Sequence, residues 1–479
     1  MTVSNAATTL EGEKAVEKLG GYQFYREVLG SPKNIVAPMV DQSELAWRIL
    51  SRRYGAQLVY TPMINAKMFA NEKTRKGYRE ANFNVPHGEE GGPLDRPLIV
   101  QFCANDPQQL LESAKFVAPH CDAVDINLGC PQDIAKKGHY GAFLQDEWEL
   151  IYELVNTLHK NLSVPVTAKF RVFPTVEKTV EYAKMLERAG AQILTCHGRL
   201  REQRGQYSGL ADWEKIRAVK EAVSIPVFAN GNILYHSDIA ACLAATGADG
   251  VMSAEGQLYN AALFAPASPA NGEGPSSPEA FDTGLHLPST ALALEYLEIV
   301  RSLRTSTALS AVKGHLFKLL RPALGRETDL RERLGRVNGT VKEGALDKYV
   351  AIVKEVQVRM EKATLEAEAR VDGRTAELVG VDGATGIKVL PHWLAQPYFR
   401  PLQVLAPKKP KTKVKAAVED VLDDTDRLRI AAAVQDKVEP DEAVVGKRDR
   451  TPEELDTSKR TKVVGDVELG APIPAMLAT

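Results

Sequence analysis

Cysteine is scarce in this sequence, and the few residues that occur show no spacing pattern. The chain has five cysteines among 479 residues, an odd number without the clustering of a metal site. This argues against a disulfide framework and against a structural zinc site, and it indicates a reducing compartment. We therefore expect no bound metal.

Long apolar runs are also missing. No stretch approaches the ~20 apolar residues of a membrane-spanning helix, and residues 1–13 are polar. We expect a soluble intracellular protein with no membrane partner, located in the cytoplasm, in the nucleus or in both. The formal net charge of −2 neither requires nor excludes an anionic partner.

Aromatic residues are absent after Phe399. Charges of both signs alternate there with Pro, Thr and Ala, so this region cannot bury enough apolar surface to fold alone. We expect a C-terminal extension over 371–479 that is mostly disordered. Its basic run 408–415 suits phosphate backbones or nuclear import, and 459–462 is a weaker run, although a solubilising tail explains both as well.

Between residues 33 and 260, short apolar runs alternate with amphipathic ones. We predict a helix over 176–189, a second helix capped by Asp212, and a third that is capped by Ser237 and ends at Gly247. Eight strands are predicted, at 34–39, 57–62, 98–103, 123–127, 165–171, 192–197, 226–230 and 250–253.

Eight strands with helical crossovers are typical of an α/β fold, the (β/α)8 TIM barrel, which we place at 31–265. An open doubly wound sheet is the structural competitor. It is disfavoured because no Gly-x-Gly-x-x-Gly turn follows the first strand.

Three further segments surround this barrel. Residues 1–30 form an N-terminal extension, and 266–290, rich in Pro, Ser, Gly and Ala, form a flexible linker. Helical periodicity at 291–304, 308–320 and 348–368 predicts a small α-helical domain over 291–370. Between Arg301 and Arg336 there are nine Lys or Arg and three acids, which fits an anion-binding surface or simply a solvated helical face.

The segment Asp125 to Pro131 reads Asp-Ile-Asn-Leu-Gly-Cys-Pro, a short strand followed by a thiol. Parallel barrels carry their chemistry at the C-terminal ends of their strands, so Asn127 and Cys130 should lie in a pocket. Taken alone, however, a free cysteine is more often a small buried apolar residue than a catalytic one.

Polar residues at the other strand ends change this interpretation. A flat, electron-rich ring needs an amide donor and acceptor, a cation at its edge and backbone amides for a phosphate. Gln101, Lys169, Gly231 and Gly256 meet these needs. Each has a plainer explanation, since a barrel lysine can be a structural ion-pair partner and Asn-Gly is a common turn, but their occurrence at one rim favours a flavin.

Several motifs together resemble the tRNA-dihydrouridine synthases, most of all the eukaryotic subfamily that modifies positions 16 and 17 of the D-loop. The resemblance covers about residues 30 to 335. It implies FMN as cofactor, NADPH or NADH as reductant and tRNA as partner of a monomeric enzyme, with the helical domain as the tRNA-binding part. The motifs that carry it are Ala37-Pro38-Met39, the segment 125–131, the segment 197–203, Ala229-Asn-Gly-Asn232 and the segment 250–256.

The resemblance also assigns roles to single residues. It makes Cys130 the catalytic proton donor, and it places Asn127, Arg171 and Arg199 against the uracil or nearby RNA. Many bacterial relatives have an arginine after the eighth strand where this chain has Ala254-Glu255-Gly256, so phosphate binding there would depend on backbone amides. The implied FMN contacts are Pro38, Met39, Val40, Gln101, Lys169, His197, Asn230, Gly231, Asn232, Ala254, Glu255 and Gly256.

The chemistry of uracil explains these roles. Its C5=C6 bond is conjugated to the C4 carbonyl, so C6 accepts a hydride from N5 of reduced flavin and C5 then takes a proton. A neutral thiol suits that second step, and burial keeps Cys130 protonated by raising its pKa. We expect Lys169 to stabilise the reduced isoalloxazine and His197 to hydrogen-bond its pyrimidine edge.

Two alternative functions remain. A flavin barrel acting on a free pyrimidine, similar to the dihydroorotate dehydrogenases, would share the FMN residues but would not need a basic helical domain. A catalytically inactive RNA-binding protein on the same barrel would have lost Cys130 or Lys169, and both are present. Comparing activity on free uridine, dihydroorotate and folded tRNA separates these possibilities.

Overall fold

A computed structural model describes residues 18–73, 75–205, 208–265, 287–383 and 385–398. Residues 1–17 of the predicted N-terminal extension and most of the predicted linker, 266–286, lie outside the described residues. So does the chain from 399 onward, including the basic runs 408–415 and 459–462.

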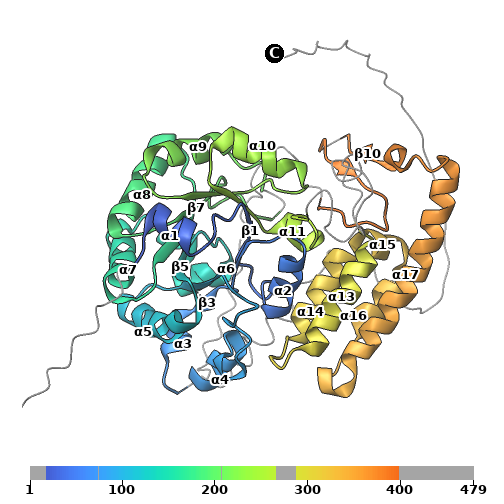
Figure 1. The fold of residues 1–479 in the computed structure, drawn as a ribbon, viewed down its shortest axis with the longest axis horizontal. Helices are drawn as coiled ribbons and strands as arrows, with labels where there is room; N and C mark the ends of the chain where they lie inside the picture. Colours follow the sequence, from blue (N-terminus) through green and yellow to red (C-terminus); the bar gives the residue numbers. More distant parts are fainter. Residues whose placement is uncertain (1–17, 74, 206–207, 266–286, 384, 399–479) are drawn as a thin grey trace, which may run out of the picture. The chain divides into compact units, whose positions relative to one another are not determined.

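Parallel strands form a closed barrel at the centre of the fold (Figure 1). The sheet runs in the order β2-β1-β9-β8-β7-β6-β5-β4, and the pairing of β2 with β4 closes it. All eight predicted strands are present and the predicted TIM barrel is confirmed. The barrel strands are β1 (Asn34–Val36), β2 (Leu58–Tyr60), β4 (Leu98–Cys103), β5 (Ala123–Leu128), β6 (Val166–Arg171), β7 (Leu194–His197), β8 (Val227–Asn230) and β9 (Gly250–Ser253), with the short β3 (Ile64–Asn65) added beside the end of β4.

Helices cover the outer faces of the strands (Figure 1). Every residue of β4 and β5 is buried, as expected for parallel strands that are enclosed on both sides. The helices of this part are α1 (Gly21–Glu27), α2 (Leu45–Arg53), α3 (Ala66–Ala70), α4 (Arg75–Asn82), α5 (Pro107–Val117), α6 (Asp133–Gly138), α7 (Trp148–Asn161), α8 (Val176–Ala189), α9 (Trp213–Ala222), α10 (Ser237–Thr246) and α11 (Glu255–Tyr259).

The predicted helix caps are confirmed in one case and wrong in another. Asp212 accepts a hydrogen bond from the backbone N–H of Lys215 at 3.0 Å, as expected for an N-cap. Ser237 does not cap α10, because His236 is the N-cap residue and Ser237 already lies in the helix. The carboxylate of Asp238 instead accepts two N–H groups of the preceding turn at 2.8 Å each, a task for which a serine hydroxyl is too short.

The predicted N-terminal extension contains a helix that packs on the barrel. Phe24 and Tyr25 of α1 are buried in the main hydrophobic core. The Tyr25 hydroxyl donates to the backbone oxygen of Asp249 at 2.9 Å, just before β9 begins. The packing of the barrel therefore starts ahead of residue 31.

Helices follow the barrel, and they share one continuous apolar core with it. The three helices predicted from periodicity are present, and two short ones, α15 and α16, lie between them. The boundary of a separate domain at 291 stays a prediction. The helices are α13 (Ser289–Ser302), α14 (Leu309–Leu319), α15 (Arg321–Arg326), α16 (Thr328–Arg336) and α17 (Ala345–Arg370). None of the helices within the described ranges is both long and apolar enough to cross a membrane.

Residues 371–398 carry regular structure, although we expected a mostly disordered extension from 371. A 3-10 helix (Thr375–Leu378) is followed by the antiparallel pair β10 (Gly380–Val381) and β11 (Lys388–Val389). Leu390 and Leu394 pack with Tyr235 of the barrel in a small apolar cluster. The side chains that hold this segment precede the aromatic-free tail, which is why the composition of the tail did not predict it.

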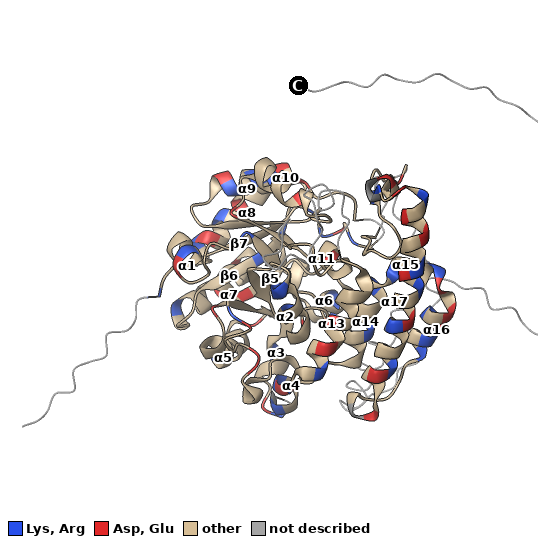
Figure 2. Cartoon of the chain, turned by 45° about the vertical axis from the view of Figure 1, so that its right-hand side comes forward, with Lys and Arg blue, Asp and Glu red and all other residues tan. Residues whose placement is uncertain are grey.

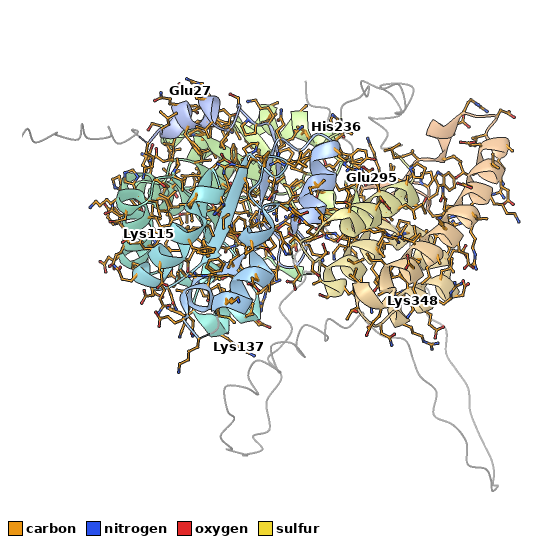
Figure 3. The ribbon with its side chains drawn as sticks, turned by 60° about the horizontal axis from the view of Figure 1, so that its bottom comes forward. Glu27, Lys115, Lys137, His236, Glu295 and Lys348 are labelled. Atoms are coloured by element: carbon orange, nitrogen blue, oxygen red, sulfur yellow. The ribbon has the colours of Figure 1, made fainter. Side chains whose placement is uncertain are left out.

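Helix α2 joins the barrel to the helical region. Glu44, at its N-terminus, accepts hydrogen bonds from the Tyr296 hydroxyl at 2.6 Å and from Nε2 of His315 at 3.1 Å. Trp47 stacks on the His315 ring with centroids 3.9 Å apart. Glu295 of α13, labelled in Figure 3, accepts from Arg53 at the other end of α2.

His315 should be neutral in this position. It is fully buried, and burial lowers its pKa below the usual 6.5 although the charge of Glu44 opposes this. Its Nδ1 has no hydrogen-bond partner among the described residues. A protonated Nδ1 would be a buried N–H without an acceptor, which is costly, whereas an unprotonated nitrogen is tolerated more easily.

This predicts a specific pH dependence of stability. The unfolded chain takes up a proton on His315 near pH 6.5, whereas the folded protein does so only at lower pH, so stability is lost as the pH falls below 6.5. His315→Gln can still donate to Glu44 but cannot titrate. Its melting temperature should therefore fall less between pH 7 and pH 5 than that of the native protein, whereas the control His120→Gln should follow the native slope.

Candidate active site

Polar side chains inside the barrel align across neighbouring strands. Gln101 on β4, Asp125 on β5 and Thr167 on β6 stand in register. Gln101 Nε2 donates to Asp125 Oδ2 at 2.7 Å, and the Thr167 hydroxyl donates to Asp125 Oδ1 at 2.6 Å. Asn127 Nδ2 donates to Gln101 Oε1 at 2.8 Å. The orientation of the predicted flavin ligand Gln101 is therefore fixed by its neighbours.

Sequence reasoning did not give Asp125 a role. Burial raises its pKa to about 6, against the opposing hydrogen bonds from Thr167 and Gln101. Its side chain follows the strand alternation that also directs Asn127 to the barrel interior. The alternation could have identified Asp125 in the sequence, because a carboxylate that points into a barrel interior needs buried hydrogen-bond partners.

Lys169 is a partly buried cation near the mouth of the barrel. Its Nζ donates to Asn230 Oδ1 at 2.8 Å, and Asn230 in turn donates to the Met252 carbonyl at 2.9 Å. Burial, helped by the charge of Arg171, lowers the Lys169 pKa to about 8. The site therefore holds a cation whose charge is incompletely balanced by the protein, and an anionic ligand would be favoured beside it.

His197, at the end of β7, is held neutral. Burial lowers its pKa well below 6.5, and the charges of Arg171, Lys169 and Arg199 act in the same direction. Nε2 lies 3.2 Å from an Nη of Arg199, so it accepts a hydrogen bond there. Arg199 also donates to the Gly209 carbonyl and to the side chain of Asn232.

Arg171 connects two active-site loops. Its Nε donates to the Gly129 carbonyl at 2.7 Å, and one Nη donates to the carbonyls of Leu200 and Gln203 at 2.9 and 3.1 Å. With 8% of its surface exposed, the side chain braces the cysteine loop against the loop after β7. A contact of Arg171 or Arg199 with RNA stays a prediction, and in this structure both act on the protein itself.

Cys130 is positioned by Asn127. The amide oxygen of Asn127 accepts the backbone N–H groups of Gly129 and Cys130 at 3.1 and 2.9 Å. Asn127 therefore shapes the turn that presents the thiol, in addition to any contact with a uracil. Burial raises the pKa of Cys130 despite the nearby charges of Arg171 and Lys169, so the thiol is neutral at pH 7.

Gly141 supports Cys130 from the other side, and sequence reasoning missed it. Its φ is +65°, and a Cβ built there would lie 2.9 Å from the Cys130 carbonyl oxygen and 3.1 Å from the Cys130 Cβ. The next residue, Ala142, donates its N–H to the same oxygen at 3.1 Å. No local motif marks this glycine, because the contact depends on the path of the chain after α6.

A cavity of about 310 Å³ lies at the ends of β7, β8 and β9. It brings together most of the predicted residues from the second half of the barrel. Pro131 and Gln132, which follow Cys130, complete its wall. The predicted residues among its lining are Arg171, His197, Arg199, Asn230, Gly231, Asn232, Ala254, Glu255 and Gly256.

The other predicted residues lie beside this cavity or away from it. Lys169 is hydrogen-bonded to the lining residue Asn230. Pro38, Met39 and Val40 follow β1, where the Met39 N–H donates to the Ser43 hydroxyl at 3.0 Å and Val40 is 42% exposed. None of these three lines the cavity.

Glycines allow the backbone to approach closely around the cavity. A Cβ on Gly256 would lie 2.3 Å from the Ile233 carbonyl oxygen. Gly231 has φ +116°, and a Cβ there would meet the Cβ of Ala211 at 2.6 Å and the His197 ring at 3.2 Å. The two glycines therefore allow the turns after β8 and β9 to pack closely against neighbouring segments while both line the cavity.

Within the described residues, no group of His, Cys, Asp and Glu side chains could hold a metal ion. The closed parallel barrel, with polar side chains and a cavity at the C-terminal ends of its strands, has the site architecture of TIM-barrel enzymes.

Comparison with known proteins gives the family. The sequence profile of the dihydrouridine synthase (Dus) family matches residues 35–357, so the chain belongs to this family. A tRNA-dihydrouridine(16/17) synthase of Saccharomyces cerevisiae is 48% identical over 81% of this chain and 88% of its own length. The Schizosaccharomyces pombe enzyme of the same name is 45% identical over 84% of this chain and 96% of its own length. A mouse protein whose name describes it as similar to this synthase is 47% identical over 80% of this chain and 72% of its own length.

Replacing Gly141 tests the support of the thiol. Gly141→Ala adds a Cβ against the Cys130 backbone at a positive φ, which for a non-glycine residue costs about 1–2 kcal/mol before any clash. The cysteine loop should shift, so that the rate of Cys130 alkylation by iodoacetamide, followed by mass spectrometry, changes several-fold. As a control, Gly30→Ala also has a positive φ and no neighbour within 4 Å but lies outside the cavity lining, and it should leave that rate unchanged.

Proposed function

We propose that this protein reduces the C5=C6 bond of uridine at positions 16 and 17 of the tRNA D-loop, with FMN as cofactor and NADPH or NADH as reductant. The observation that carries the proposal is a neutral thiol, Cys130, held at the mouth of a barrel that also contains the partly buried cation Lys169. Family membership and the names of the relatives, which include NAD(P)(+) and positions 16/17, support it.

The residues present fit FMN. Lys169 offers an incompletely balanced positive charge, Gln101 has a fixed amide, and His197 is a neutral ring beside them. The turns at Gly231 and Gly256 line the cavity, and their backbone amides would hold the phosphate. When bound, FMN would supply the hydride for C6 of the uracil.

Cys130 would supply the proton for C5. Because burial raises its pKa, the thiol is fully protonated at pH 7 and can act as an acid. After proton transfer the sulfur carries a negative charge, which the cations Arg171 and Lys169 stabilise from the same wall of the barrel. Asn127 holds the backbone N–H of Cys130, which limits the positions that the sulfur can take.

Only part of the basic span from Arg301 to Arg336 is free to bind an anion such as tRNA. Several of its cations are already bound, since Arg301 pairs with Asp347, Arg333 with Glu355 and Arg336 with Glu332. Figure 2 shows these opposite charges intermixed over α16 and α17.

Two arginines of the span are better placed to bind phosphates. Lys318 is partly buried and already donates a hydrogen bond to Gln42. Arg326 and Arg331 are exposed, and neither forms an ion pair with a carboxylate among the described residues. The neighbouring acids in the sequence are bound by other arginines, Glu327 and Asp329 by Arg359 of α17 and Glu332 by Arg336. We expect Arg326 and Arg331 to contact tRNA phosphates, which position the RNA without reading its sequence.

The first test is the cofactor. The protein purified from an expression host should be yellow and should release FMN, with no covalent adduct, on acid denaturation. Lys169→Met keeps the length of the side chain but removes its charge, and it should lower the affinity for FMN about 10- to 100-fold, because one charge-assisted contact is worth about 1.5–3 kcal/mol. Protein that shows no flavin absorbance after reconstitution with FMN would contradict the proposal.

The second test is the proton donor. Cys130→Ala should bind FMN and oxidise NADPH with oxygen as the native protein does. Its formation of dihydrouridine in unmodified tRNA should fall by ~10²–10⁴, the usual contribution of a general acid. Cys242→Ala, a change at a buried cysteine of α10, serves as the control and should stay active. Native turnover by Cys130→Ala would assign the proton to another group, and turnover of free uridine would favour a free pyrimidine as substrate.

A further inference from the structure

A second and larger cavity lies outside the candidate active site. It measures about 790 Å³ and opens between α15, α17 and the segment that follows β11. In Figure 1 the orange segment around β10 lies beside α17 and α15. The two cavities share no lining residue, so this one needs its own explanation.

The walls of this cavity combine positive charge with aromatic rings. Arg321, Arg326 and Arg370 line it, against the single carboxylate of Glu366. The rings of His392, Trp393 and Tyr398 line it as well.

The aromatic wall is held in place by hydrogen bonds. The Trp393 carbonyl accepts both the N–H and the hydroxyl of Ser289, at 3.1 and 3.2 Å. Gln396 is buried, accepts the Leu390 N–H at 2.7 Å and donates to the Lys388 carbonyl at 3.0 Å. The segment 388–398 is therefore hydrogen-bonded to the helical region through Ser289, and its own backbone is held by Gln396.

One stacking position is already formed. The guanidinium of Arg321 lies 3.9 Å from the centre of the Tyr398 ring. The same arginine reaches the hydroxyl of Tyr259 at 3.4 Å, at the end of the helix that follows β9. The planar arginine and tyrosine thus present a preformed surface close to the barrel rim.

These features match the chemistry of a nucleotide. Unstacked bases bind on aromatic rings and guanidinium planes, arginines bind the adjacent phosphates, and the volume is within the ~300–1,000 Å³ of ordinary ligand sites. We propose that this pocket binds one unstacked nucleotide of the tRNA, outside the loop that enters the barrel. The inference rests on the proposed function for the identity of the RNA.

An RNA nucleotide fits this pocket better than a free dinucleotide. Arg326 lines the cavity together with Arg321 and Arg370, so the phosphates on either side of a bound base would meet positive charge. A dinucleotide reductant would have to reach the flavin at the barrel mouth, and the cavity there shares no lining residue with this pocket. The pocket would hold the tRNA at a second point and so fix the angle at which the D-loop approaches Cys130.

The test compares Tyr398→Ala with Tyr398→Phe. Loss of the ring should weaken binding of unmodified tRNA about 10-fold, within the range for one stacked base, whereas phenylalanine keeps the stack and should bind within about twofold of the native protein. FMN content and the KM for NADPH with oxygen as acceptor should stay native in both. Ultraviolet crosslinking should attach a nucleotide to the peptide that contains Trp393 and Tyr398.

A charge-matched pair of variants completes the design. Arg326→Ala with Arg370→Ala should weaken tRNA binding and reduce its salt dependence, whereas Lys184→Ala with Arg188→Ala, on exposed positions of α8, should not.

Three results would overturn the proposal. These are native tRNA affinity in Tyr398→Ala, a change confined to the KM for NADPH, and crosslinks confined to the barrel mouth. A native protein that binds tRNA but forms no dihydrouridine would refute the proposed function instead, because the pocket is judged on binding alone.

Discussion

The site depends on Asn127, whose side chain hydrogen-bonds both the barrel interior and the turn that carries Cys130. Its amide nitrogen is fixed by Gln101 inside the barrel, so its amide oxygen can face only the turn that carries Cys130. The rigid sheet therefore sets the position of a loop residue through one side chain. Around it, incompletely balanced cations favour an anionic ligand. Burial keeps the Cys130 thiol neutral against these charges, whereas burial and the charges act together to keep the His197 imidazole neutral.

Much of this arrangement could be read from the sequence. The strands were predictable because each is a short apolar run between turn residues, and parallel strands place their C-terminal ends at one rim. The motif around Cys130 and the polar residues after six strands therefore indicated the site and its chemistry. Asp212 could be predicted as a cap because the reach of an aspartate to the N3 amide is a purely local property.

The parts that could not be predicted depend on contacts between distant segments. Gly141 looks like any turn glycine until the chain brings it against Cys130. Arg171 and Arg199 carry the charge expected of RNA ligands, yet backbone carbonyls of neighbouring loops bind them. The order of residues 371–398 comes from a few apolar contacts with Tyr235, which composition cannot reveal.

The bracing role of Arg171 has a consequence for how this enzyme can vary. Since one guanidinium holds the carbonyls of two loops, the lengths of these loops are not independent, and an insertion in either would leave buried donors without acceptors. Relatives should therefore tolerate sequence change in the loop after β7 while keeping its length. The variation that adapts such enzymes to different RNA positions would then accumulate where no shared brace exists, in the helices and the segment behind them.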